Sequence, residues 1–386
     1  MKQRKLAWTY YQPLKGLYIT ARLLALLALV PSWTVYYTLF KRPRPSWTLK
    51  ECVLVRLIHW IMPLNAHCGI SPLKTSKARE VPQSELKEST FVWIEPADSK
   101  FVVGIAKDDK VLPQRIPGYV WPKGADIASE TGLVGLWFHG GGYMMGNATE
   151  SYEESNIPRL IQRHSKMKTI LAVDYRLSSE DCHPAQLLDA LSGYSCLVNT
   201  LGMDPARIVL LGACAGGHLV PLLMRYLYEE KVLPPPAAAM LFSPWLDMVI
   251  DFEIIKDQSR VRPNTEVDML SSSHLANLLF LGHHSAEILG SPYLSANRTP
   301  SDGFKDYPPI FVSVGDAEAF KRECDELVDK LRKDGVDVTY DVQKDAAHDF
   351  WGALVVPNDA ARARLAENVY QWLAELDGQA RKVASA

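Results

Sequence analysis

The feature that most constrains the fold is a cysteine framed by glycines at residues 212–217, which read GACAGG. The run RIVLLG at 207–212, rich in β-branched and aliphatic residues, leads into it, and a long apolar helical pattern follows from His218. A strand that turns sharply into a helix with the pattern G-x-S-x-G presents a nucleophile at the end of a sheet. The central residue here is Cys214 in place of serine. The pattern predicts a parallel sheet with a nucleophilic turn at Cys214.

Short apolar runs alternate with longer helical periods from about residue 90 onward. This alternation is typical of βαβ units and of a doubly wound, mostly parallel sheet. Eight strands are predicted, at 91–95, 101–106, 132–139, 168–175, 207–212, 237–243, 309–315 and 338–343. Helices are predicted at 156–164, 184–201, 218–230, 323–334 and 359–376. The fold class predicted is therefore α/β, with an eight-stranded sheet.

The first 85 residues lie outside this alternation. Residues 23–40 contain no charged side chain, lie between two basic stretches, and are close to the minimum length of a membrane span. Together with a second apolar stretch at 50–62, they fit equally well an amphipathic lid over the catalytic domain, because length alone does not separate the two. We therefore predict that residues 1–85 form a membrane anchor or a lid. Localisation stays open between a membrane, such as the endoplasmic reticulum, and the cytoplasm.

The remaining residues, 86–386, are predicted to form one catalytic domain. A stretch at about 248–307 is too long for a plain connection between a strand and a helix, and it contains a helical pattern at 271–282. Long insertions in compact domains tend to be lids or binding loops. We expect this insertion to join the N-terminal segment in a helical cap.

Composition narrows the choice of partner. The net charge of -2 gives no electrostatic reason to expect nucleic acid. The six cysteines form no C-x-x-C pair and no His/Cys cluster at metal-ligand spacing, so no metal and no cofactor are predicted. A small molecule remains as the expected partner.

A glycine run lies upstream of the cysteine. His139, Gly140, Gly141 and Gly142 directly follow the apolar run GLVGLWF. Glycines there allow close approach of the backbone to a substrate, and their N–H groups can stabilise a developing oxyanion. A glycine run alone is a weak signal. Paired with the turn at Cys214, it indicates acyl chemistry.

In these motifs and their order, the chain resembles the hormone-sensitive-lipase-like branch of the α/β-hydrolase superfamily. Residues 173–190, VDYRLSSEDCHPAQLLDA, are similar to the family block Y-R-L-x-P-E…P-A…D-A, and SPWLD at 243–247 is similar to its S-P-W-x-D turn. The resemblance implies an α/β-hydrolase fold with a helical cap. It also implies that Gly141, Gly142 and Ala215 supply the oxyanion-hole amides.

The same resemblance indicates the partners of the nucleophile. His348, in DAAHDFW, matches the family's catalytic histidine and comes last in the chain order that this fold requires. The segment SVGDAEAFKREC at 313–324 resembles the one that carries the acid. Alignment from its right-hand end puts Glu318 on the catalytic carboxylate, with Asp316 as the alternative. Either carboxylate could accept the histidine N–H and fix its tautomer.

Two departures from the family turn, which usually reads G-D-S-A-G-G, change the expected chemistry. Ala213 replaces the acid and Cys214 replaces the serine. A thiol at a helix N-terminus beside a histidine should have a lowered pKa and be a good nucleophile. Thiolate leaves a tetrahedral intermediate more readily than alkoxide does, so cysteine favours thioesters, lactones and aryl or enol esters.

The sequence thus predicts a hydrolase of the esterase or lipase type that acts through an acyl-cysteine intermediate on a small hydrophobic ester, thioester or lactone. Two alternatives stay open. One is a cyclase, condensing or acyl-transfer enzyme of a specialised-metabolite pathway, with a polyketide-like substrate. The other is an inert ligand-binding protein on the same scaffold, as the gibberellin receptors look to be. Those receptors have lost the catalytic histidine, whereas His348 is present here.

Overall fold

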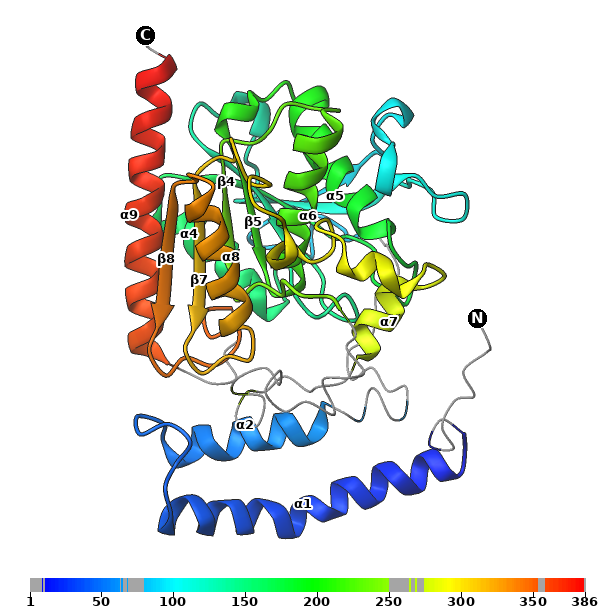
Figure 1. The fold of residues 1–386 in the computed structure, drawn as a ribbon, viewed down its shortest axis with the longest axis vertical. Helices are drawn as coiled ribbons and strands as arrows, with labels where there is room; N and C mark the ends of the chain where they lie inside the picture. The colour runs from blue at the N-terminus through cyan, green and yellow to red at the C-terminus, as the bar shows by residue number, and fades with distance from the viewer. Residues whose placement is uncertain are drawn as a thin grey trace.

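The computed structural model describes residues 9, 11–62, 64, 68, 80–249, 264, 268, 274–352 and 358–384. Its centre is one eight-stranded sheet with helices on both faces (Figure 1). The strands are β1 Thr90–Ile94, β2 Ile116–Trp121, β3 Val134–Phe138, β4 Thr169–Val173, β5 Ile208–Ala213, β6 Ala238–Phe242, β7 Ile310–Gly315 and β8 Val338–Gln343. Their order in the sheet is β1-β2-β4-β3-β5-β6-β7-β8. β2 pairs antiparallel with β1 and β4, and all other pairs are parallel.

Helices cover the two faces of the sheet and leave the carboxyl ends of its parallel strands to the loops. The helices are α1 Leu14–Leu39, α2 Leu49–Ile61, α4 Asn156–His164, α5 Ala185–Ser195, α6 Ala215–Glu230, α7 Leu275–Leu281, α8 Lys321–Lys333 and α9 Asp359–Ala384. One face packs against α5, α6 and α8, and the other packs against α4 and α9. The predicted α/β-hydrolase fold, with a doubly wound and mostly parallel sheet, is confirmed.

One predicted strand is wrong, and a different segment takes its place. Residues 101–106 form parts of two short 3-10 turns, Ser99–Phe101 and Gly104–Ala106, not a strand. The second strand is instead β2, whose sequence IPGYVW contains a proline and a glycine that both disfavour a strand. β2 forms because all six of its residues are buried between β1 and β4. Tertiary burial thus outweighs local propensity in this part of the sheet.

The N-terminal helices α1 and α2 lie side by side across the end of the domain toward which β7 and β8 point (Figure 1). α2 begins with a capping box in which the Thr48 side chain accepts from the Glu51 N–H and the Glu51 carboxylate accepts from the Thr48 N–H. α1 is the one helix in the described part of the chain that is long and apolar enough to cross a membrane, and its most apolar window is not buried in the molecule. The predicted boundary at residue 85 falls between α2 and β1 and stays a prediction.

The predicted insertion at 248–307 is described only in part, since residues 250–263, 265–267 and 269–273 lie outside the described residues. Its described part contains α7, within the helical pattern predicted at 271–282. α7 lies over the glycine loop, because a Cβ built on Gly142 would be 3.9 Å from the Ala276 Cβ. Phe280 of α7 also stacks on Tyr143, with ring centroids 4.8 Å apart.

Candidate active site

Cys214 lies at the turn between β5 and α6, at the carboxyl end of a central strand. Its backbone has φ 48° and ψ -110°, a strained conformation for a residue with a side chain. Two glycines permit this turn. A Cβ on Gly212 would lie 2.2 Å from the Gly216 carbonyl oxygen, and one on Gly216 would lie 2.0 Å from that of Phe138. The glycines of GACAGG therefore allow the turn that places Cys214 at the start of α6.

His348 and Glu318 are joined by a 3.0 Å hydrogen bond between the ring Nδ1 and the carboxylate Oε2. Glu318 follows β7 and His348 follows β8, so neighbouring strands deliver both side chains. The other carboxylate oxygen, Oε1, accepts from the Ser243 hydroxyl at 2.7 Å and from the Gly315 N–H at 2.6 Å. Both oxygens of Glu318 are thus fixed. Ser243 is a positioning contact that the sequence analysis did not assign, although SPWLD contains it.

The surroundings of His348 favour its protonated form. Burial alone would lower the pKa of His348, but a charged Cys214, a hydrogen bond with the Cys214 side chain and the Glu318 carboxylate outweigh burial. The pKa of His348 is therefore raised well above its ordinary value. Burial also raises the pKa of Glu318, and the hydrogen bond with His348 opposes that rise. This geometry can hold a thiolate and an imidazolium side by side.

Asp316, the alternative acid, contacts residues other than His348. Its Oδ1 accepts from the Asp345 N–H at 2.7 Å and lies 3.9 Å from Nη1 of Arg44. One third of its side chain is exposed, 33%, whereas Glu318 is fully buried. The structure brings Glu318 to His348, and it gives Asp316 a contact with the N-terminal segment.

The glycine loop after β3 has the backbone conformation that only glycine adopts readily. Gly141 and Gly142 have φ angles of 101° and 61°. A Cβ on Gly141 would lie 2.2 Å from the Met145 carbonyl oxygen, so no larger residue fits. Within the described residues, the amides of Gly141, Gly142 and Ala215 have no hydrogen-bond acceptor. Unpaired amides at a helix start and in a glycine loop are suited to donate hydrogen bonds to an oxyanion.

Two buried carboxyl groups that the sequence analysis did not single out lie beside Cys214. Glu154 accepts from the Gly140 N–H through Oε2. A Cβ on Gly140 would lie 2.4 Å from Glu154 Oε1 and 2.9 Å from the Cys214 Cβ, so the glycine backbone alone separates these two side chains. Asp349, which follows His348, forms a side-chain hydrogen bond with Glu154.

Burial raises the pKa of both carboxyl groups, Glu154 and Asp349. Burial raises the pKa of Asp349 to about 7, against the opposing charge of His348. Burial, and after it the charges of Asp349 and Cys214, raise the pKa of Glu154 well above its ordinary range. One proton shared between two carboxyls is the usual outcome when both lie in a low-dielectric site. Glu154 lies in the polar run ESYEES, where neither periodicity nor a motif marks it.

Aromatic side chains line the region above the nucleophile. Cys214 is 7% exposed and belongs to the apolar core on the α6 face. Tyr143 contacts Phe280, and its hydroxyl lies 2.5 Å from Nδ1 of His218. Trp245 lies next to Tyr143, with ring centroids 6.4 Å apart. These apolar surroundings keep bulk water away from the thiol.

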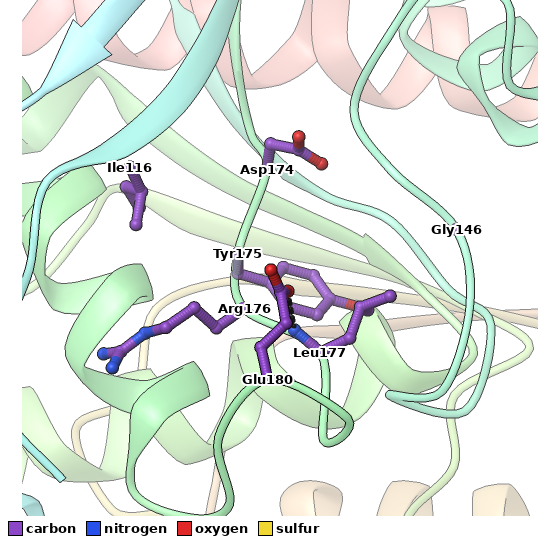
Figure 2. A pocket seen from close by; sticks show the side chains of 7 residues that line it. All are labelled: Ile116, Gly146, Asp174, Tyr175, Arg176, Leu177 and Glu180. Carbon is purple, nitrogen blue, oxygen red and sulfur yellow. Dashed lines mark hydrogen bonds between the residues drawn. The ribbon is translucent and has the colours of Figure 1, made fainter. Parts of the chain in front are cut away.

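A small pocket lies beside the glycine loop, between Ile116, Gly146 and residues 174–180 (Figure 2). Its volume is about 10 Å³, which is room for about one water molecule and not for a substrate. Arg176 at its wall pairs with buried Asp189 at 2.9 Å. The charged residues of this block therefore hold the loop instead of contacting a ligand.

Comparison with known proteins assigns the fold and gives named relatives. The sequence model of a family described as the alpha/beta hydrolase fold matches residues 135–352, a range that includes Cys214, Glu318 and His348. An ethyl acetate hydrolase of Pseudomonas putida is 25% identical over 332 residues, which cover 79% of this chain and 93% of that protein. An acetyl-hydrolase of Streptomyces hygroscopicus is 26% identical over 221 residues, which cover 57% of this chain and 69% of that protein.

Solved structures agree with the family match. A hormone-sensitive lipase from a metagenome library is 24% identical and superposes with a TM-score of 0.55. The superposition covers 67% of this chain and 82% of that one. An esterase/lipase from an uncultured bacterium, 21% identical, superposes over 92% of this chain and 98% of that one, with a TM-score of 0.58. This likeness extends the shared fold to nearly the whole chain.

Proposed function

The chain belongs to the alpha/beta hydrolase fold family, and we propose that it hydrolyses esters through an acyl-enzyme formed on Cys214. It is a hydrolase of the esterase/lipase type, and relatives named acetyl-hydrolase and ethyl acetate hydrolase support ester cleavage as its reaction. The observation that carries the cysteine mechanism is the 3.0 Å hydrogen bond between His348 and Glu318, together with the Cys214 charge that is among the causes of the raised pKa of His348. The substrate is a small hydrophobic ester, thioester or lactone.

In the first step, the ring nitrogen of His348 that does not face Glu318 holds the Cys214 thiol proton, and the thiolate attacks the carbonyl carbon. A carbon–sulfur bond forms, and the carbonyl π electrons move onto the oxygen. The amides of Gly141, Gly142 and Ala215 stabilise this oxyanion. Removing one such donor from an oxyanion hole costs about 10²–10³ in kcat.

In the second step, the tetrahedral intermediate collapses. The bond to the leaving oxygen or sulfur breaks, and the leaving group takes the proton from His348. An acyl-cysteine thioester remains on Cys214. Water then gives a proton to His348 and attacks the thioester carbonyl, and the thiolate departs to release the carboxylic acid.

The nucleophile determines which esters react. When the leaving group is a simple alkoxide, the thiolate of Cys214 is the better leaving group, so the intermediate returns to substrate unless His348 protonates the oxygen first. A thiolate, enolate or aryl oxide competes far better. We therefore expect thioesters, aryl or enol esters and strained lactones to exceed alkyl esters in kcat/KM.

Glu154 positions the glycine loop in this mechanism. Its carboxylate accepts the Gly140 N–H, and that contact fixes the chain one residue before the Gly141 amide. Because Asp349 and Glu154 form a side-chain hydrogen bond, the loop is linked to the residue next to His348. The contact thus joins the oxyanion loop to the loop that carries His348.

Acyl transfer or cyclisation is the second candidate, and one observation favours it. Cys214 is 7% exposed and belongs to the same apolar cluster as Tyr143 and Phe280, so the acyl-cysteine would form in a site with little water. A nucleophile within the acyl group, such as the enol or hydroxyl of a polyketide-like substrate, would then compete with water. The product mixture from such a substrate separates hydrolysis from ring closure.

Association with a membrane is the proposed role of the outer face of α1. Large apolar side chains on this helix are exposed, among them Leu17, Leu24, Leu27 and Leu39. Basic residues follow its end, in KRPR at 41–44. An apolar helix face flanked by cations suits the boundary between acyl chains and phosphate head groups.

Trapping of the acyl-enzyme tests the proposal. Brief reaction with p-nitrophenyl acetate, acid quench and intact mass analysis should show one added acetyl group on the full-length protein, mapped to the peptide with Cys214. The Cys214→Ala variant should show none and lose nearly all activity, whereas Cys196→Ala serves as a matched thiol control and should behave as wild type. Cys214→Ser should raise the ratio of alkyl-ester to thioester kcat/KM. Acetylation that survives in Cys214→Ala would refute the mechanism.

A further inference from the structure

We propose that Asp108, His283 and His284 form a binding site for one divalent transition-metal ion of the zinc class. The sequence analysis predicts no metal, because it sought cysteine pairs and His/Cys spacing. The fold brings together instead a carboxylate and an adjacent histidine pair that are 175 residues apart in sequence. One ligand atom from each of the three side chains lies within 4.8 Å of the other two.

The donor set matches the chemistry of zinc and its neighbours. Two imidazole nitrogens and a carboxylate oxygen, with a position left for water, are a common three-ligand arrangement for Zn²⁺. Ligand atoms about 2.0–2.2 Å from a tetrahedral ion lie about 3.3–3.6 Å from one another. Nε2 of His283 is 2.9 Å from Oδ2 of Asp108, and Nε2 of His284 is 3.5 Å from the same oxygen. These two separations are within a few tenths of an ångström of that range, and the ligand atoms of the two histidines lie within 4.8 Å of each other.

The carboxylate is prepared for a cation. Its other oxygen, Oδ1, accepts from the Lys110 N–H at 2.7 Å and the Val111 N–H at 2.9 Å, so Oδ2 is left to face the two rings. Burial would raise the pKa of Asp108, but these amides and His283 outweigh it and lower the pKa to about 2. Oδ2 is therefore the carboxylate oxygen available to an ion beside the two rings.

The second ring nitrogen of His283 is also partnered. Its Nδ1 lies 3.4 Å from the Cys182 sulfur. Histidines that bind metals usually donate their other N–H to a fixed group, which orients the ring. Gly282 makes the contact possible, because with φ 59° it passes so close to Cys182 that a Cβ would lie 2.3 Å from the sulfur.

One contact opposes metal binding and limits its strength. Nε2 of His284 also lies 2.8 Å from the His183 carbonyl oxygen, to which it donates in the metal-free protein. Binding requires that this ring release the proton and turn its lone pair to the ion. Loss of the hydrogen bond to the His183 carbonyl oxygen is therefore a cost that the ion must offset.

An ion at this position would join the cap to the catalytic domain. Both histidines directly follow α7, whereas Asp108 lies in the loop between β1 and β2. α7 covers the glycine loop through Ala276 and Phe280, and its Phe280 carbonyl accepts from the His183 N–H at 2.7 Å. A metal ion held by both parts would restrain α7 in its position over Gly142. The site would then act as a metal-dependent clamp on the cap.

Titration with Co²⁺ tests the site, because Co²⁺ replaces Zn²⁺ and its visible absorption reports tetrahedral coordination. Detergent-solubilised full-length protein should bind one Co²⁺ and release it to excess Zn²⁺. Asp108→Asn keeps the oxygen that accepts the two amides, so the loop should stay folded while affinity falls at least about 10-fold to 100-fold. The double variant His283→Gln/His284→Gln should lose the band.

Two control variants make the result specific. His164→Gln changes an exposed histidine on α4 and should bind Co²⁺ as wild type does. Cys214→Ser removes the other candidate thiol–imidazole site and should also bind Co²⁺. Undiminished binding in both Asp108 and histidine variants, or loss of binding in Cys214→Ser alone, would overturn the proposal.

Hydrogen exchange tests the clamp separately. Saturating Zn²⁺ should slow amide exchange in α7 of the wild type and leave it unchanged in Asp108→Asn. Equal exchange in α7 with and without bound Zn²⁺ would reject the clamp. Neither measurement depends on the reaction proposed for Cys214, so a failure here leaves that proposal intact.

Discussion

Replacement of Glu318 by glutamine should nearly abolish catalysis while preserving the fold. The substitution keeps the size of the side chain and removes its charge. Oε1 of Glu318 accepts from the Gly315 N–H at 2.6 Å and the Ser243 hydroxyl at 2.7 Å, so a glutamine must place its carbonyl oxygen there. Its NH₂ group then faces Nδ1 of His348, where the carboxylate oxygen lies at 3.0 Å. The NH₂ group of the glutamine and the Nδ1–H of His348 are both donors, so they cannot form a hydrogen bond with each other.

The size of the effect follows from the tautomer. A ring forced to keep Nδ1 unprotonated carries its hydrogen on the nitrogen that should receive the thiol proton. The same exchange of acid for amide in a Ser-His-Asp triad lowers kcat about 10⁴-fold. We expect a loss of about 10³–10⁴ in kcat/KM, which corresponds to about 4–5.5 kcal/mol of transition-state stabilisation. Loss of the Glu318 charge also removes one cause of the raised pKa of His348, so the imidazolium should lose its proton at lower pH.

Initial rates with p-nitrophenyl acetate and the pH dependence of iodoacetamide alkylation measure the two effects. Asp316→Asn is the matched control, because Asp316 contacts Asp345 and Arg44 instead of His348. It should retain activity within about threefold of wild type, because Asp316 is a partly exposed loop residue that does not contact His348. If Asp316→Asn is inactive while Glu318→Gln is not, the assignment of the acid is wrong.

Three further predictions concern the surroundings of the site. Burial raises the pKa of Asp174 to about 7, so its carboxyl contributes stability that is present below about pH 4 and is lost as pH rises through 7. Urea unfolding of Asp174→Asn should therefore show a free energy of unfolding that is higher than that of wild type by about 2–4 kcal/mol at pH 8, and nearly unchanged at pH 4. Glu154→Ala should lower kcat about 10- to 100-fold with a smaller change in KM, and Glu154→Gln, which keeps an acceptor for Gly140, should restore most of it; equal loss in both variants would contradict the positioning role. Removal of residues 1–42 should abolish co-sedimentation with phosphatidylcholine vesicles, and persistent binding would place the membrane contact elsewhere.

Much of the fold could be predicted from the sequence because its central strands are buried on both faces. Seven of the eight predicted strands coincide with strands of the structure. The central ones are buried along their whole length and read as apolar runs between helical periods. β2 was missed because IPGYVW is stabilised by its neighbours and not by its own propensity. The turn at Cys214 was found because close backbone contacts demand glycine at Gly212 and Gly216, and that demand is visible in sequence.

The contacts around the site could not be predicted in the same way, because they join distant segments through single side chains. Glu154 contacts Asp349, and Asp108 contacts His283, and no sequence motif or periodicity marks these pairs. The choice between Glu318 and Asp316 rested on alignment alone. Geometry separates them because β7 ends at Gly315, and the chain then turns so that Glu318 is buried and Asp316 faces the N-terminal segment.

The N-terminal segment can be a membrane anchor and a lid at the same time, because the structure connects its apolar helix α1 to the loops that carry the acid and the base. Trp47, after α1, donates from its indole to the Asp345 carbonyl at 2.7 Å, three residues before the base. Arg44 donates to the Asp316 carbonyl at 2.9 Å, two residues before the acid. Tyr37 of α1 shares an apolar cluster with Ala317 and Ala347, the immediate neighbours of Glu318 and His348. A membrane surface that fixes α1 would therefore also restrain the loops that position Glu318 and His348.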